Sequence, residues 1–371
     1  TGGSDSNTVS GNYIGLGSDG STVIGNGSGG VNIENPSSNN TIGGTTSNDR
    51  NIISGNSDSG IVIAGSTANT NVVSGNYIGT DSTGAIDKCN STYGVVLDNS
   101  SSNTVGGTTG VTVGGNCTGA CNVISGNGAD GIWFYGDFAD SNNIKGNYIG
   151  TDVSGNIGLG NSNSGINITN SSDSNLIGGS TAAERNIISD NDYHGIGMYS
   201  TANALNNVIS GNYIGTGADG TTDLGNAWEG VYANDHVQST LIGGTASGQA
   251  NLIKNNGGGV AVVNSTATNN AIIGNSLYRN DNTQIDLEGN GIRDPNDAGD
   301  VDTGGNDLLN KPEWSTYVES AGNTDVEYTL DVPAGEYRIE TFSDNGKTLI
   351  DTQNITHTGS GSESFSNTIT G

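Results

Sequence analysis

Apolar and polar positions follow one another in a short pattern that begins with glycine and returns along most of the chain. The pattern is Gly-φ-x-φ, where φ is an aliphatic or aromatic residue, and neighbouring copies start 29 to 37 residues apart. A period of this length is typical of proteins in which one structural unit is stacked on the next. The eight copies start at Gly30, Gly60, Gly94, Gly131, Gly165, Gly195, Gly230 and Gly259.

Two more short apolar segments accompany most copies, and Gly, Asn, Ser and Asp residues separate them. Residues 71–81, Asn-Val-Val-Ser-Gly-Asn-Tyr-Ile-Gly-Thr-Asp, represent one type of unit. Residues 40–44, Asn-Thr-Ile-Gly-Gly, and 50–56, Arg-Asn-Ile-Ile-Ser-Gly-Asn, represent a second type, which alternates with the first. Such segments, bounded by turn-forming residues, predict brief strands rather than helices.

Strict alternation within a copy predicts a strand with one buried face, so that Ile61 and Ile63 point inward and Val62 points outward. Three short strands per unit, each paired with its counterpart about 4.8 Å away, predict a parallel β-helix. We therefore expect an all-β fold, a right-handed parallel β-helix of about nine coils over residues 1–291. A propeller would require four longer strands in every blade.

Asparagine and glycine recur at the corners between these strands, as in the Ser-Gly-Asn steps at 54–56 and 74–76. We expect the stacked asparagine side chains to form hydrogen-bonded ladders. Arg50 and Arg185 occupy matching places in two units of the second type, so we expect both to anchor loops. Since residue 1 already lies within the repeat, we also expect the chain to be a processed or trimmed product.

With these segments, the chain resembles the right-handed parallel β-helix repeat proteins of bacterial and archaeal surfaces. The resemblance covers about residues 7–290. It implies the fold and an extracellular or cell-surface location. It does not imply one activity, because such helices carry lyases, hydrolases and epimerases as well as adhesins and structural proteins.

The pattern changes over residues 313–371. Here apolar and polar residues alternate strictly in three segments, 326–330, 336–342 and 364–369. This part of the chain predicts a small immunoglobulin-like β-sandwich. Such a sandwich usually needs about 100 residues and seven strands, so we expect an incomplete one. Either the chain has been cut, or a neighbouring molecule supplies the missing strand. The second alternative predicts self-association, through the sandwich or through stacked ends of the β-helix.

Residues 292–312 form an Asp-rich linker between the two predicted domains. Flexible acidic loops supply the oxygen ligands that Ca²⁺ prefers, and similar segments follow the β-helix in the surface proteins that the chain resembles. The linker lacks the spacing of an EF-hand, and a solvated polar linker is the alternative. The candidate ligands are Asp294, Asp297, Asp300, Asp302 and Asp307.

The chain carries 38 acidic and 10 basic residues, for a net charge of −28. Nucleic acids and anionic membrane surfaces are therefore unlikely partners, because no basic stripe is available to bind phosphate groups. The sequence also has no apolar run of the roughly 18 residues that a membrane span needs. The composition favours cation binding and high solubility.

Cysteine and asparagine residues suggest two covalent modifications. Cys117 and Cys121 flank a three-residue loop and predict a local disulfide, while Cys89 in the preceding unit is a competing partner. Asn-x-Ser/Thr sequons recur along the chain and make a glycoprotein an open alternative. A Ser- and Asn-rich sequence also produces such sequons by chance.

One column of polar positions is the candidate for chemistry. The residue before each repeat glycine should stack from coil to coil, which places His194 beside Glu229 as a candidate acid/base pair. Asp130 lies three coils from Glu229, about 14 Å at 4.8 Å per coil, too far for a glycosidase pair. Aromatic rings offer an apolar face to sugars, and these form a candidate carbohydrate-binding surface: Trp133, Tyr135, Tyr199, Trp228 and Tyr232.

Two classes of function follow from this sequence. The regular repeat and short loops favour an extracellular structural or adhesive protein, such as a filament or surface-layer subunit. The polar and aromatic column favours a polysaccharide-active enzyme, either a lyase or a glycoside hydrolase, or a carbohydrate-binding surface without turnover. The regularity along the whole axis makes the structural class our first hypothesis.

Overall fold

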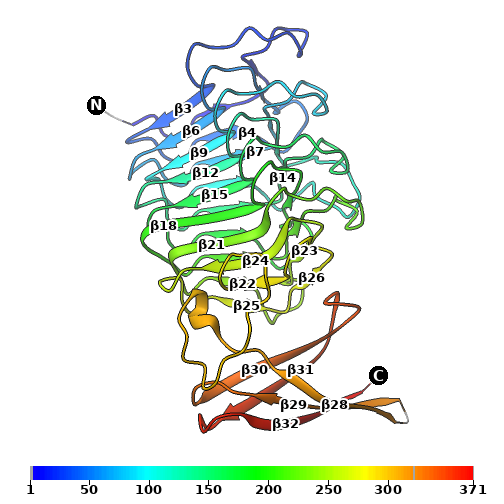
Figure 1. Ribbon diagram of the computed structural model, residues 1–371. Coiled ribbons are helices and arrows are strands. Elements are labelled where there is room, and N and C mark those ends of the chain that lie inside the picture. The colour runs from blue at the N-terminus through cyan, green and yellow to red at the C-terminus, as the bar shows by residue number, and fades with distance from the viewer. Residues whose placement is uncertain (1–2, 321, 371) are drawn as a thin grey trace.

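The computed structural model describes residues 3–320 and 322–370 and contains a parallel β-helix followed by small antiparallel sheets (Figure 1). The β-helix has three parallel sheets of nine strands each, in which every third strand of the chain pairs with the next. The prediction of an all-β fold with about nine coils is confirmed.

The strand bounds follow the repeat. The first sheet contains β1 (Thr8–Val9), β4 (Thr41–Gly43), β7 (Val72–Ser74), β10 (Thr104–Gly106), β13 (Asn143–Lys145), β16 (Leu176–Gly178), β19 (Val208–Ser210), β22 (Leu241–Gly243) and β25 (Ala271–Ile273). The second contains β2 (Tyr13–Ile14), β5 (Ile52–Ile53), β8 (Tyr77–Ile78), β11 (Val123–Ile124), β14 (Tyr148–Ile149), β17 (Ile187–Ile188), β20 (Tyr213–Ile214), β23 (Leu252–Lys254) and β26 (Ser276–Tyr278).

The third sheet is formed by the Gly-φ-x-φ segments and carries the candidate site. It contains β3 (Val31–Glu34), β6 (Ile61–Ala64), β9 (Val95–Asp98), β12 (Ile132–Tyr135), β15 (Ile166–Thr169), β18 (Ile196–Leu205), β21 (Glu229–Gln238), β24 (Gly258–Val263) and β27 (Ile285–Asp286). Its φ positions, such as Ile132 and Phe134, are fully buried in one apolar core along the axis. The x positions between them, such as Trp133, point outward.

Three asparagine ladders hold the corners of successive coils together, as predicted. In the central coils, Asn76 donates from its backbone N–H to Oδ1 of Asn122 (2.9 Å) and from Nδ2 to the carbonyl of Ile42 (2.9 Å). Its own Oδ1 accepts from both nitrogens of Asn51. Beyond the first coil, the ladder asparagines in the nine coils are buried. Each of them therefore satisfies backbone groups that a tight corner would leave unpaired.

Loops outside the core are anchored at recurring positions. Nε of Arg50 donates to the carbonyl of Gly75 (3.2 Å), and its guanidinium lies 4.0 Å from the ring centroid of Tyr77. Arg185 repeats both contacts with Gly211 (3.2 Å) and Tyr213 (3.9 Å), which confirms the prediction of two loop anchors. A disulfide joins Cys117 and Cys121, and Cys89 is a free thiol.

The C-terminal part has five strands in two sheets. A three-stranded antiparallel sheet contains β28 (Glu313–Ser320), β29 (Asn323–Leu330) and β32 (Glu363–Thr370), and β30 (Gly335–Ser343) pairs with β31 (Thr348–His357). A small core, which includes Leu330, Val332 and Ile355, lies between the sheets. The sequence pattern predicted β29, β30 and β32 but missed β28 and β31.

The two-stranded sheet does not pack closely on β28, since residues of both line one open cavity, among them Trp314, Tyr317, Phe342 and Ile350. Trp314 and Tyr317 pair with Tyr328 and Val326, which face the small core and are buried. Trp314 and Tyr317 share that inward face, yet they are 57% and 64% exposed. Five strands are described here, and the relation of this part to an immunoglobulin-like sandwich stays a prediction.

The linker and the β30–β31 turn lie against the last coil, and the sandwich follows below it in the view of Figure 1. Asn306, in the 3-10 turn η1 (Gly305–Leu308), continues one ladder by accepting from the N–H of Asn270 (2.9 Å). The N–H of Leu277 donates to the carbonyl of Gly346 (3.0 Å). These contacts satisfy backbone groups at the end of the β-helix, where no further coil is described.

Candidate functional site

The predicted column of residues lies on one edge of the third sheet. The N–H of Gly131 donates to the carbonyl of Ser164, that of Gly165 to His194, and that of Gly195 to Glu229, each at 3.0 Å. The same pattern joins Gly94 to Asp130 (3.1 Å). The structure thus brings Asp130, His194 and Glu229 into one column, in the predicted order.

Aromatic residues gather beside this column in two groups, which together form what we call the aromatic face. The first group belongs to β12 and the coil before it. The rings of Tyr93 and Trp133 are stacked with centroids 4.4 Å apart, and the ring of Tyr135 lies 4.5 Å from that of Trp133. Tyr135 is 43% exposed, so this group offers rings to the solvent.

The second group surrounds His194 and comes from the coils of β18 and β21. Tyr232 stacks on the imidazole with centroids 4.5 Å apart and planes 7° apart, and Tyr193 lies 4.1 Å from it. Trp228 lies 5.1 Å from Tyr193 and is 52% exposed. Tyr199 lies 5.3 Å from Tyr232 and completes the group.

His194 and Glu229 are in direct contact, but the rings cover the histidine. Nδ1 of His194 lies 3.0 Å from Oε2 of Glu229, although the two groups are not aligned as a hydrogen bond. The His194 side chain is only 1% exposed. Burial acts to raise the pKa of Glu229, but the neighbouring His194 outweighs it and holds that pKa below its usual value. Glu229 is therefore ionised at neutral pH.

Asp130 is buried and supports the neighbouring coil. Its carboxylate accepts from the N–H of Ser164 (2.9 Å) and from Nδ2 of Asn167 (3.1 Å). Burial raises the pKa of Asp130 to about 6, against the effect of these two hydrogen bonds. The structure separates Asp130 from Glu229 by the coils of Ser164 and His194, so the two carboxylates do not meet.

Gly197 shapes the centre of the aromatic face. A Cβ atom at this position would lie 2.9 Å from the ring of Tyr199, so glycine lets that ring fold back toward Ser164 and His194. Burial raises the pKa of Tyr199, and the neighbouring Tyr193 adds to the shift. Besides His194 Nδ1 and Glu229 Oε2, four buried polar atoms in this region have no hydrogen-bond partner among the described residues: Ser164 Oγ, Asn167 Oδ1, His194 Nε2 and Tyr199 Oη.

Buried polar atoms are nearly always hydrogen-bonded in folded proteins. A group of four unpartnered atoms is therefore typical of a place that takes up a small polar group, such as a water molecule or a hydroxyl. These atoms are buried, and the ring of Tyr232 is stacked on His194, so a ligand reaches this place only after side chains move. The exposed rings at its edge are accessible directly.

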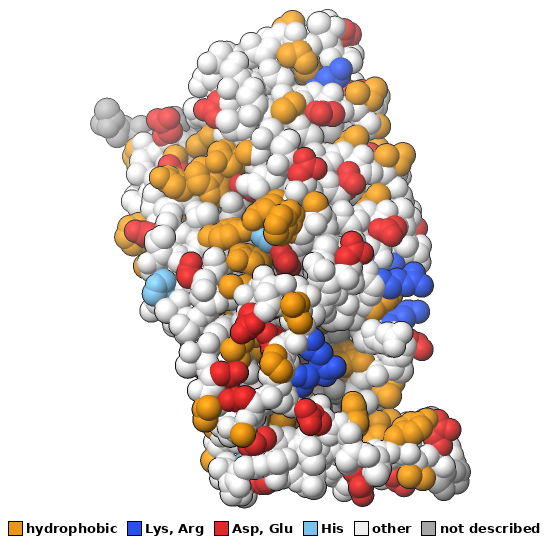
Figure 2. Space-filling model, viewed as in Figure 1, with side chains coloured by type: hydrophobic (Ala, Val, Ile, Leu, Met, Phe, Trp, Pro, Cys, Tyr) orange, Lys and Arg blue, Asp and Glu red, His pale blue; other side chains and the backbone are white. Residues whose placement is uncertain are grey.

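The charge of this face is one-sided. The nine strands of the third sheet contain no Lys or Arg but five carboxylates: Glu34, Asp98, Glu229, Asp235 and Asp286. In Figure 2, apolar side chains gather along the face with a histidine among them, and basic side chains lie apart from them. The face is therefore suited to uncharged or cationic ligands.

The Asp-rich linker brings together some of its predicted ligands. Carboxylate oxygens of Asp297, Asp300 and Asp302 lie within 4.8 Å of one another. Burial raises the pKa of Asp300, and neighbouring carboxylates, including that of Asp331, add to the shift. Asp294 and Asp307 do not belong to this group, and Oδ2 of Asp294 accepts from the N–H of Leu287 (2.9 Å). Calcium binding stays a prediction.

Sequence reasoning did not assign three contributors, which are Tyr93, Tyr193 and Asp331. Tyr193 stands one residue before His194 and occupies the same place in its coil as Trp228 in the next, since the N–H of Trp228 donates to the carbonyl of Tyr193 (3.1 Å). Aligning the repeats two residues before each glycine would have found it. Asp331 follows β29, and no local pattern links it to the linker.

Comparison with protein-family models, curated proteins and solved structures found no match to this chain. Within the described ranges, no helix is long and apolar enough to cross a membrane.

Proposed function

We propose that this protein is an extracellular structural or adhesive β-helix that binds a polysaccharide along its aromatic face without cleaving it. The observation that carries the proposal is the pair of aromatic groups on one side of the third sheet. They stand on coils that otherwise repeat, so their rings form two platforms at a fixed separation along the axis.

Exposed rings supply the binding energy in this proposal. Tyr135 and Trp228 are 43% and 52% exposed, and each is held in place by a neighbouring ring. A pyranose buries apolar C–H groups against such a ring, and the cost in conformational freedom is low because the ring is already packed. Binding at both platforms by one chain adds avidity.

The geometry around His194 argues against turnover. A general base must reach the proton that it removes, within hydrogen-bonding distance or through one water molecule. His194 is 1% exposed beneath Tyr232, and Asp130 is 2% exposed and engaged by two donors. His194 packs against the rings, and Asp130 is hydrogen-bonded to the adjoining coil, so both positions support the local structure.

The charge of the face sets the expected class of glycan. With five carboxylates and no basic residue on the strands of the third sheet, a uronate chain would be repelled. A neutral polysaccharide, or one that contains amino sugars, meets no such barrier. We therefore expect neutral and amino-sugar polymers to bind more tightly than uronate polymers.

Affinity electrophoresis through gels that contain neutral, amino-sugar or uronate polysaccharides tests the proposal. Trp228→Ala should weaken retardation roughly tenfold, since a buried aromatic side chain contributes about 1.5–3 kcal/mol. Trp314→Ala is the matched control, because Trp314 is 57% exposed but lies in the C-terminal sandwich. The proposal fails if no polysaccharide retards the wild-type protein, or if the two variants lose retardation equally.

Turnover is tested on the same polymers. We expect no release of reducing ends or unsaturated products by the wild-type protein. Sustained release that disappears in the His194→Ala, Glu229→Ala double variant would instead assign the face to an enzyme. A heat-treated preparation of the wild-type protein, at the same concentration, is the control.

Self-association through the sandwich stays a prediction. The exposed rings of Trp314 and Tyr317 on β28 are the feature that motivates it. Electron microscopy of the purified protein, with and without calcium, checks it. Filaments or ordered arrays would support a structural subunit, and dispersed monomers under every condition would contradict it.

A further inference from the structure

A cavity lies at the end of the β-helix, far in sequence from the aromatic face. The linker folds over the last coil and borders this open cavity of about 720 Å³, which is within the usual range for small-molecule sites. Its walls are mostly apolar and come from the last coil and from the linker: Ile272, Ile285, Leu287, Pro295, Leu308 and Leu309. Ile272 and Leu287 also pack against the core of the β-helix, so the cavity stands where that core ends.

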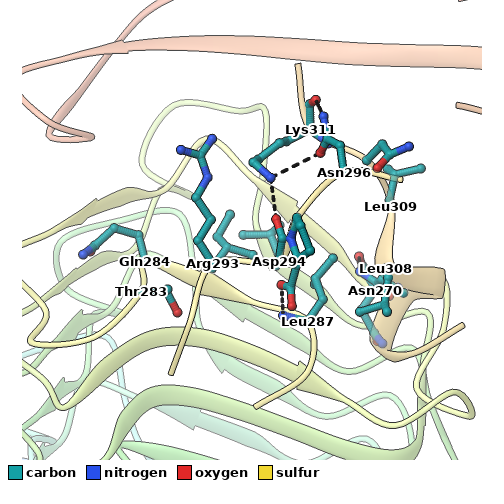
Figure 3. Close-up of a pocket in the computed structure, with 15 residues that line it drawn as sticks. Asn270, Thr283, Gln284, Leu287, Arg293, Asp294, Asn296, Leu308, Leu309 and Lys311 are labelled. Atoms are coloured by element: carbon teal, nitrogen blue, oxygen red, sulfur yellow. Dashed lines mark hydrogen bonds between the residues drawn. The ribbon is translucent and has the colours of Figure 1, made fainter. Parts of the chain in front are cut away.

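Two of the ten basic residues of this acidic chain line the same cavity (Figure 3). Lys311 is tied to the linker, because its Nζ donates to the carbonyl of Asp294 and to Oδ1 of Asn296 (3.2 Å). Arg293 is exposed, and it takes part in none of the ion pairs among the described residues. In Figure 3 its side chain extends beside Thr283 and Gln284 with no contact drawn to its guanidinium.

We propose that this cavity binds a small amphipathic acid, in which an apolar body carries a single carboxylate. The apolar body lies against Leu308, Leu309 and Ile285, two of which are otherwise exposed by more than 40%. The carboxylate meets the Arg293 guanidinium, whose planar fork of donors matches it. Asp294 also lines the cavity and disfavours a second acidic group on the ligand.

The charges that line the cavity favour an acid over an alcohol or an amine with the same apolar body. An alcohol of the same length would gain the apolar contacts but leave Arg293 without an anion. An amine would place a third cation beside Arg293 and Lys311. The proposal is independent of glycan binding, because it uses none of the residues of the aromatic face.

Calorimetric titration of the full chain with decanoate, decanol and decylamine tests the proposal. Decanoate should bind at least about tenfold more tightly than either relative, and Arg293→Gln should remove about that difference, as expected for a charged hydrogen bond. Arg279→Gln is the matched control, since Arg279 is an exposed arginine that does not line the cavity.

Leu309→Glu places a carboxylate in the wall and should abolish decanoate binding. Leu309 is 43% exposed, so the variant should fold, and unchanged thermal unfolding confirms it. The proposal is overturned if wild-type protein does not bind decanoate, if the three probes bind equally, or if Arg293→Gln and Arg279→Gln behave alike. Binding of an apolar peptide C-terminus with no binding of decanoate would also overturn it in favour of a protein partner.

Discussion

The asparagine corners and the aromatic face belong to the same coils but differ in how they use the repeat. At the corners the same residue returns in coil after coil, and nearly every side chain is buried and hydrogen-bonded to its neighbour. On the aromatic face, one register position holds Val96, Trp133, Asn167, Gly197 and Tyr232 in successive coils.

This difference separates positions that stabilise the fold from positions that form its outer surface. A position that must satisfy buried backbone groups tolerates few residue types, so it repeats. A position on the outer face of a sheet is free to vary without cost to the core. In this chain the variation includes the rings of the aromatic face, and unpartnered buried atoms of Ser164, Asn167 and His194 lie in the same coils.

The largest expected effect is at a ladder corner. Asn76→Ala should lower the free energy of unfolding by about 3 kcal/mol or more, because the carbonyl of Ile42 and the N–H of Asn51 lose their partner inside the protein. Denaturant unfolding measures the change. The exposed Asn282 is the control, and Asn282→Ala should stay within about 0.5 kcal/mol of wild type. Equal effects at the two positions would contradict the role of the ladders.

The next effect concerns Asp130 and depends on pH. In the folded protein its pKa is about 6, against an ordinary value of 3.8, so between these values the folded state holds more protons than the unfolded state. Stability therefore falls as the pH rises through this window. Asp130→Asn removes that loss, and its stability relative to wild type should rise by up to about 3 kcal/mol between pH 4 and pH 7.

Denaturant unfolding of both proteins at pH 4 and pH 7 measures this difference. The asparagine can keep both contacts, since Asn167 has an unpartnered Oδ1 that accepts after its amide turns. Other titrating groups are common to both proteins and cancel in the comparison. A difference that does not change with pH would show that Asp130 titrates normally.

Replacing a loop anchor should have a smaller effect on stability. The effect should be equal at equivalent positions of the repeat. Arg185→Gln removes a cation from the face of Tyr213 and a hydrogen bond to Gly211, and should cost about 1–2 kcal/mol. Arg50→Gln should cost the same within about 0.5 kcal/mol, because its contacts match in kind and distance. Thermal unfolding of the two variants compares their losses of stability. Clearly unequal losses would mean that equivalent positions in the repeat do not contribute equally to the free energy of unfolding.

Trp228 should matter least for stability. Its ring is half exposed and packs mainly on Tyr193, so Trp228→Ala should change the free energy of unfolding by less than about 1 kcal/mol. The same variant should lose roughly tenfold in polysaccharide affinity. Chemical unfolding and affinity electrophoresis on one preparation give both numbers. A large loss of stability would mark Trp228 as a structural residue instead.

The fold was predictable because its main constraint is local. Gly94, Gly131 and Gly165 fix the period, and the alternation after each of them fixes which side chains enter the core. The ladders were predictable for the same reason. The strands β28 and β31 were missed, because their sequences lack strict alternation and their pairing depends on partners distant in sequence.

The candidate site was only partly predictable. The column of Asp130, His194 and Glu229 follows from the repeat, but the burial of His194 does not. That burial depends on where the rings of Tyr199 and Tyr232 turn, and the absence of a side chain at Gly197 decides this for Tyr199. Side-chain packing across three coils leaves no signal in a single repeat.

The most direct test replaces rings with the residues that other coils place at the same positions. Val96 pairs with Trp133, Asp98 pairs with Tyr135, and Asn163 stands two coils from Trp228 in the same column. We predict that the triple variant Trp133→Val, Tyr135→Asp, Trp228→Asn unfolds at the wild-type midpoint within a few degrees but loses polysaccharide retardation at least about tenfold. Undiminished retardation of this folded variant would contradict the central claim that departures from the repeat form the binding face.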